Sequence, residues 1–185
     1  MKTERQAIAD VILLTPAKHG DARGFFSETF SAARARDAGI EYDFVQDNHS
    51  MSQARGVLRG LHCQLAPHAQ GKLVRCVKGS IWDVAVDARR GSPTFGQHVA
   101  AELSAANWQQ LWIPPGFLHG FCTLEPDCEV VYKTTGYYDQ ASERGIIWND
   151  PTLAIPWPVT AAEVQLSGKD VELPRWSDMG DWFAV

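Results

Sequence analysis

The chain has 185 residues, 45% of them hydrophobic, which predicts one ordinary domain with a substantial core over residues 1–185. Its net charge of −5 disfavours a nucleic-acid partner, because binding a phosphate backbone requires a basic face. The first apolar run, Val11 to Leu14, is too short for a signal peptide or a membrane span, so no membrane association is expected.

The N-terminal part contains one helix signal and one cluster of potential ligand-binding groups. Ser27–Ala38 is rich in Ala and Arg and is followed by Gly39, which predicts a helix that ends there. Just before it, Arg23 precedes a Gly-Phe-Phe run. Together with Arg59, this arginine suits bidentate contacts to a diphosphate, although solvated salt bridges are the simpler alternative.

From residue 44 onward, short β-type runs are separated by Gly and Pro turn signals. They are Phe44–His49, Val57–Gln64, Lys72–Val77, Ile81–Val86, Gln97–Leu103, Gln110–Ile113, His119–Leu124 and Glu129–Thr135. Short strands at this spacing are typical of an all-β sandwich or barrel of the jelly-roll kind. The helices and glycine-rich loops of a doubly wound nucleotide fold are missing.

The run around His62 carries the first candidate for chemistry. Strict alternation puts Arg59 and His62 on opposite faces, and a bulge at Gly60 would let both face the interior. Histidine can shuttle protons when a partner orients its second ring nitrogen, and Asp83 and Asp170 are both candidates for that partner. A hydrogen-bonded core histidine beside a surface arginine is the alternative interpretation.

Gln64 stands where a second histidine would complete a metal-binding pair with His62. Its presence argues against a metal site and favours acid–base chemistry. Lys72 begins the next strand, and an inward-facing lysine could stabilise an enolate oxygen. A strand-end lysine that extends into water is the alternative.

Two later runs place further polar groups near the predicted interior. A rigid Pro-Pro-Gly turn delivers His119 to the start of a strand, and Tyr132 lies in EVVYKTT on a face shared with Val130 and Thr134. A buried tyrosine commonly only packs and donates one hydrogen bond. Across a cavity from a histidine, it could instead return a proton to the opposite face of a carbanion.

The C-terminal part, from Asn149 on, is rich in Pro and Trp, and we expect irregular chain wrapped over the barrel with a short helix near Ala161–Val164. The chain also contains four scattered cysteines without a CxxC motif, each within an apolar run. This pattern predicts buried free thiols in a reducing cytoplasm.

Several of these runs together resemble one known family. PPGFLHGF and GVLRGLHCQ are similar to the two motifs of the cupins, with Gln64 replacing a metal-binding histidine. GDARGFF, FVQDNHS, VLRGLHCQ, AQGKLVR, DVAVDARRGSPTFG, QLWIPPGFLHGF, YKTTGYY, GIIWNDP and LSGKD follow in order from about Asp10 to Asp170. They resemble the metal-free cupin family of dTDP-4-dehydrorhamnose 3,5-epimerases.

The resemblance implies roles for individual residues. His62 corresponds to the base that removes the C3 and C5 protons of dTDP-4-keto-6-deoxy-D-glucose, with Asp170 as its partner and Asp83 as second choice. Lys72 matches the residue that stabilises the C4 enolate, and Tyr132 matches the acid that reprotonates from the other side. The implied substrate contacts are Arg23, Glu28, Gln46, Asp47, Asn48, Arg59, Lys72, His119, Glu143 and Lys169.

The resemblance also implies an all-β, cupin-type double-stranded β-helix (jelly roll) with short peripheral helices. It implies a homodimer with N-terminal strand exchange, a dTDP-sugar substrate, no cofactor and no metal. Three alternatives stay open: a C3-only or C5-only epimerase or a ketoisomerase acting on a related dTDP-4-keto sugar; a non-catalytic nucleotide-sugar-binding cupin; and a metal-dependent cupin oxygenase or isomerase.

Overall fold

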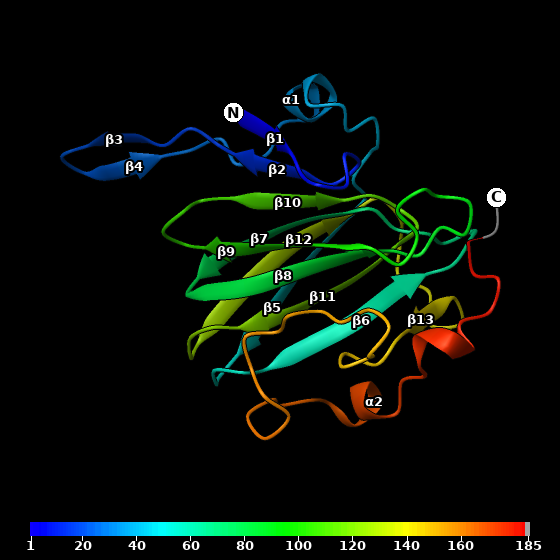
Figure 1. The fold of residues 1–185 in the computed structure, drawn as a ribbon. Coiled ribbons are helices and arrows are strands. Elements are labelled where there is room, and N and C mark those ends of the chain that lie inside the picture. The colour runs from blue at the N-terminus through cyan, green and yellow to red at the C-terminus, as the bar shows by residue number, and fades with distance from the viewer. Residues whose placement is uncertain (184–185) are drawn as a thin grey trace.

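The computed structural model describes residues 1–183 and consists mainly of two antiparallel β-sheets that face each other (Figure 1). The six-stranded sheet has the order β1 (Lys2–Arg5), β2 (Ile12–Thr15), β10 (Gln110–Ile113), β7 (Lys72–Lys78), β12 (Cys128–Thr134) and β5 (Gln46–Ser52). The five-stranded sheet has the order β13 (Glu143–Gly145), β6 (Leu58–Gln64), β11 (Phe117–Thr123), β8 (Ser80–Asp87) and β9 (His98–Ser104). This confirms the all-β, cupin-type prediction.

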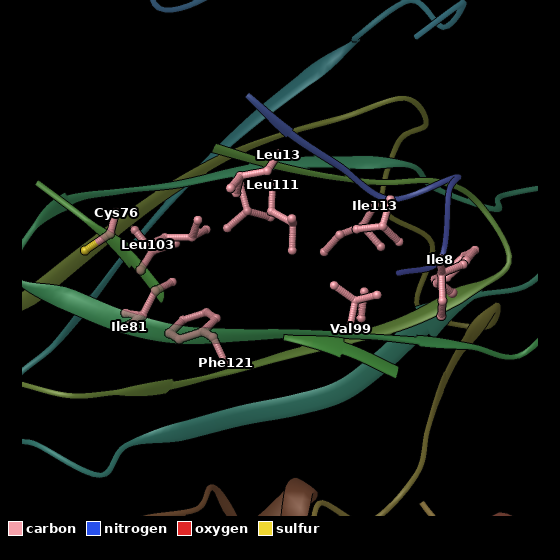
Figure 2. Close-up of a cluster of buried hydrophobic side chains, with 14 of the residues drawn as sticks. Ile8, Leu13, Cys76, Ile81, Val99, Leu103, Leu111, Ile113 and Phe121 are labelled. Carbon is pink, nitrogen blue, oxygen red and sulfur yellow. The ribbon is translucent and has the colours of Figure 1, made fainter. Parts of the chain in front are cut away.

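The main core lies between the two sheets, where apolar side chains of β2 and of β7 to β12 point inward. Figure 2 shows Leu13, Leu111 and Ile113 from the six-stranded sheet facing Ile81, Val99, Leu103 and Phe121 from the other. Every one of these side chains is 9% exposed or less. Apolar packing therefore holds the two sheets together.

The outer face of each sheet has its own cover. Leu61, Val84 and Leu118 of the five-stranded sheet pack against the C-terminal segment, which supplies Leu153, Trp176 and Met179. On the six-stranded sheet, Ile12, Leu14, Leu73 and Trp112 pack against Ala35 and Ile40. The predicted wrapping of the Trp-rich C-terminal part over the barrel is confirmed, and this wrapping carries residues 165–170 to the end of β6.

All eight predicted strands are present, with ends shifted by three residues or fewer. The sequence prediction missed β1, β2 and β13, and also the hairpin of β3 (His19–Asp21) and β4 (Gly24–Phe26), which projects away from the sheets (Figure 1). These strands are only three or four residues long, and a period of two cannot be recognised over so few positions.

The helix predictions were less accurate. The expected helix Ser27–Ala38 is limited to α1 (Ala32–Asp37), because residues 27–31 form no regular element and the Thr29 carbonyl accepts a hydrogen bond from Gln110 Nε2 at 2.8 Å. The helix expected near Ala161–Val164 is only a turn. Short helices form instead at α2 (Gly168–Val171) and η1 (Trp176–Asp178). Among the described residues, no helix is long and apolar enough to span a membrane.

Candidate active site

A glycine in β6 decides which side chains of that strand reach the interior. Gly60 has φ +126°, and a Cβ atom there would lie 2.6 Å from Gly120 Cα. The pairing of β6 with β11 shifts register at the same place. The irregularity expected at Gly60 is thus present, and it allows Arg59 and His62 to line one cavity although they are three residues apart.

This cavity has a volume of about 500 Å³ and lies between strands of both sheets and the C-terminal segment. Its floor includes Phe121, which also belongs to the main core (Figure 2). The full lining is Ser50, Val57, Leu58, Arg59, His62, Lys72, His119, Phe121, Tyr132, Gln165, Leu166, Ser167, Lys169 and Asp170. All four residues expected to be catalytic therefore line a single cavity, as do the predicted substrate contacts Arg59, His119 and Lys169.

His62 forms a close pair with a carboxylate from the C-terminal segment. His62 Nε2 lies 2.6 Å from Asp170 Oδ1, and Asp170 is 3% exposed. Ser167, the N-cap of α2, donates from its hydroxyl to Asp170 Oδ2 at 2.8 Å. Burial tends to raise the pKa of Asp170, but hydrogen bonds from His62 and Ser167 outweigh it, so the pKa lies below its ordinary value.

The contact with Asp170 selects one tautomer of the His62 imidazole. An ionised Asp170 only accepts hydrogen bonds, so His62 carries its proton on Nε2 and keeps Nδ1 free to take up another proton. Of the two carboxylates left open by the sequence, Asp170 is the one that contacts His62.

Asp83 instead pairs with the second histidine of the cavity. His119 Nε2 lies 2.9 Å from Asp83 Oδ2, and the carboxylate is fully buried. His119 and His62 are direct partners across the β6–β11 ladder. Burial lowers the pKa of His119, although Asp83 opposes the shift. Two neighbouring imidazoles are therefore each held by their own carboxylate.

Lys72 and Tyr132 come from the other sheet, on neighbouring strands β7 and β12. Burial lowers the pKa of Lys72, while the charges of Cys63, Asp83 and Glu143 oppose the shift. Burial raises the pKa of Tyr132, so its phenol is protonated at neutral pH. A basic imidazole and a phenolic acid thus approach the same cavity from facing sheets.

A smaller adjoining cavity of about 140 Å³ shares His62, Lys72 and Tyr132 with the first. It is lined in addition by the predicted contacts Gln46, Asn48 and Glu143, and by Cys63, Gln64, Gln70 and Tyr138. Glu143 Oε1 lies 2.5 Å from Lys169 Nζ, and Glu143 Oε2 accepts a hydrogen bond from the Tyr138 hydroxyl at 3.0 Å. This pair of contacts connects β13 with α2 beside the Asp170 carboxylate.

The remaining predicted contacts lie elsewhere within one chain. Asp47 borders a separate cavity and pairs with Lys133 at 2.7 Å. Arg23 lies on the β3–β4 hairpin, where its side chain is 90% exposed and pairs with Asp21 (Figure 1). Glu28 pairs with Arg34 at 2.9 Å. Arg23 and Glu28 line none of the cavities described here.

Three site residues were missed from the sequence. Ser167 and Tyr138 lie inside the LSGKD and YKTTGYY motifs, which drew attention only to Asp170, Lys169 and Tyr132. Gln64 was noted only as a missing histidine. Among residues 1–183, no group of three or more His, Cys, Asp or Glu side chains is arranged to hold a metal ion.

Comparison with known proteins gives a consistent result. Residues 5–178 match the family model described as dTDP-4-dehydrorhamnose 3,5-epimerase. The chain is 52% identical over 184 residues to an enzyme of that name from Shigella flexneri, covering 99% of this chain and 98% of the relative. It is 54% identical over 179 residues to one from Pseudomonas aeruginosa, with 96% and 97% covered.

A solved structure agrees with these relatives. It is a dTDP-6-deoxy-D-glucose-3,5-epimerase from Legionella pneumophila in complex with dTDP-4-keto-L-rhamnose. It superposes with a TM-score of 0.92 at 46% identity, and the alignment covers 97% of this chain and 94% of that one.

Proposed function

This chain belongs to the dTDP-4-dehydrorhamnose 3,5-epimerase family. We propose that it inverts the configuration at C3 and C5 of the substrate sugar, with His62 as the base and Tyr132 as the acid. The reaction converts dTDP-4-dehydro-6-deoxy-D-glucose to dTDP-4-dehydro-L-rhamnose. The observation that carries the assignment of roles is the approach of His62 and Tyr132 to one cavity from facing sheets.

The base acts at carbons next to a ketone. Both C3 and C5 flank C4, so one histidine can remove either proton when the sugar ring presents it. The Asp170 carboxylate accepts a hydrogen bond from Nε2–H of His62 and stabilises the imidazolium that forms when Nδ1 takes up the substrate proton. This pairing supports His62 as the residue that begins each inversion.

Deprotonation leaves an enolate whose negative charge lies on the C4 oxygen. Lys72 lines the cavity beside His62 and Tyr132, and its ammonium group can donate to that oxygen. Because burial places the pKa of Lys72 below that of ordinary lysine, the ammonium group is a stronger hydrogen-bond donor than an exposed one. One such group serves both inversions, since both generate charge on the same oxygen.

Inversion requires a proton to return on the face opposite the base. Tyr132 meets this need because burial keeps its phenol protonated and its strand lies in the sheet that faces β6. Water must be kept from the enolate between the two steps, because it would otherwise reprotonate the enolate without control. No electrons leave the substrate, so the reaction requires no redox cofactor.

The nucleotide part of the substrate carries negative charge, which the cationic side chains of Arg59 and Lys169 can meet in the larger cavity, where His119 is a further proposed contact. Arg23 and Glu28 would act in a homodimer, in which the exposed β3–β4 hairpin of one copy reaches the cavity of the other. The exposure of Phe25 (56%) and Phe26 (71%) on this hairpin supports such a contact. Each copy would contribute residues 1–185 as one domain.

A cytoplasmic location fits the same proposal. All four cysteines are free and buried, as predicted, which is the state expected in a reducing compartment.

The direct test is incubation of the enzyme with dTDP-4-dehydro-6-deoxy-D-glucose in heavy water, followed by proton NMR. Deuterium at both C3 and C5 is expected, and label at one carbon alone would contradict the double epimerisation. In His62→Ala, the rate of deuterium exchange at both carbons should fall by about 100-fold or more, because the variant lacks the base that removes the proton. Exchange at the wild-type rate in this variant would exclude His62 as the base.

A further inference from the structure

Gln64 occupies the position of the second metal-binding histidine of metal-dependent cupins, and its amide is fully used in another way. The residue is 5% exposed. Its Nε2 donates to the backbone carbonyls of His68 and Tyr137, each at 3.3 Å. Its Oε1 accepts from the backbone amide of Asp139 at 2.6 Å.

Two of these contacts hold the loop 136–139, which follows β12. Other side chains hold the same loop: Gln70 and Thr134 donate to the Gly136 carbonyl at 2.7 and 2.9 Å. Gln46 Oε1 accepts from the Tyr138 amide at 3.2 Å. Side chains thus bind polar backbone groups of four consecutive residues, and Gln64 binds at two of the four.

This loop is connected to the catalytic pair through a closed series of contacts. Tyr138 donates to Glu143, Glu143 pairs with Lys169, and Lys169 precedes Asp170. Asp170 in turn contacts His62, which lies two residues before Gln64 on β6. A shift of the loop would therefore move the wall of the site that contains Glu143 and Lys169.

We propose that Gln64 is a positioning residue that fixes loop 136–139 as a wall of the sugar-nucleotide site, a role that rests on the function proposed above. Holding the loop in this way requires one buried side chain that donates two hydrogen bonds and accepts one. Glutamine supplies all three, whereas glutamate can only accept and leucine can do neither. The position that binds metal in other cupins serves here to anchor a loop.

The test compares Gln64→Leu and Gln64→Glu with wild type and with Gln97→Leu, whose exposed side chain lies away from the cavities. Hydrogen–deuterium exchange measured on peptides covering residues 136–143 reports the loop without requiring activity. Steady-state kinetics with the dTDP-4-keto sugar then separates KM from kcat. Melting temperatures identify variants that fail to fold.

For Gln64→Leu we expect the exchange rate of peptides that contain Asp139 to rise about tenfold. We expect KM to rise by a similar factor, with kcat within about twofold of wild type. Gln64→Glu, which keeps the bond from Asp139, should be intermediate, and Gln97→Leu should match wild type. Unchanged exchange, an unchanged KM, or a fall in kcat alone would each overturn the proposal.

Two further outcomes are informative. If Gln64→Leu does not fold, Gln64→Glu provides the decisive values, and failure of both to fold would make Gln64 a residue of the fold rather than of the site. If wild type lacks epimerase activity, the proposed function fails while the exchange data still report on the loop.

Discussion

Tyr132 and Lys72 lie on neighbouring strands, and burial shifts their pKa values in opposite directions. The pKa of Tyr132 rises and that of Lys72 falls, because burial disfavours the charged form of each group. The two groups have separable roles, which substitutions at each can measure.

Removal of the Tyr132 hydroxyl should separate proton loss from inversion. In Tyr132→Phe we expect substrate deuteration in heavy water to persist, while formation of the inverted product falls by about 100-fold or more. NMR measures both quantities in one sample. Tyr42→Phe, which alters an exposed tyrosine packed on Trp112, is the control. Normal inversion in Tyr132→Phe would remove the residue from the acid role.

The alkaline limb of the pH profile should depend on Lys72. The active form is protonated and its pKa is lowered, so kcat should fall as pH rises through a value below that of ordinary lysine. Lys72→Arg should lower kcat about tenfold and move the limb to higher pH, because arginine keeps its proton. A limb at the same pH in both proteins would show that another group controls it.

The residue types made His62, Lys72 and Tyr132 candidates for the site, and the resemblance carried by their motifs implied that they act together with Asp170. They could not choose between Asp83 and Asp170, since 108 residues separate His62 from Asp170 and only the docked C-terminal segment brings them together. Ser167 and Gln64 were missed for another reason. Their importance lies in contacts with backbone and carboxylate groups, which no local pattern reveals.

Among the secondary-structure elements, β6 shows how one irregularity shapes a site. The irregularity at Gly60 was predicted because Arg59 and His62 could not otherwise share a face. The long strands were predictable from their alternation and their turns. The strands β1 to β4 were not, because three or four residues are too few to reveal a period of two, and the helix α2 has only four residues.

Gly60→Ala tests this role of β6. The new Cβ would lie 2.7 Å from the His119 carbonyl oxygen, and the backbone conformation is strained for alanine. We expect a loss of about 2–3 kcal/mol in the free energy of unfolding, together with reduced kcat/KM as Arg59 and His62 shift. Chemical denaturation and kinetics measure the two effects. Gly180→Ala, where the nearest atom is 3.6 Å away, is the control, and equal stability of the two variants would contradict the role of Gly60.

For the whole molecule, the proposed hairpin exchange between two copies makes a distinctive prediction. Arg23→Ala removes a group that would act in the partner's cavity, whereas His62→Ala removes a group that acts in its own. Mixed dimers of the two inactive variants would contain one intact site.

Refolding equal amounts of Arg23→Ala and His62→Ala together should restore about a quarter of wild-type activity, since half the dimers are mixed and each has one working site. Each variant refolded alone is the control, and light scattering confirms the dimer. Recovery of no activity from the mixture would place Arg23 in the site of its own chain, and wild-type activity of Arg23→Ala refolded alone would place it outside any site.

The late position of Asp170 in the chain also bears on how the enzyme is made. All strands of both sheets emerge from the ribosome before the carboxylate that orients His62. The nascent polypeptide can therefore build most of its scaffold before it acquires a working proton acceptor. Catalytic competence then arrives with a segment that follows both sheets in the chain, after the surrounding architecture is ready to receive it.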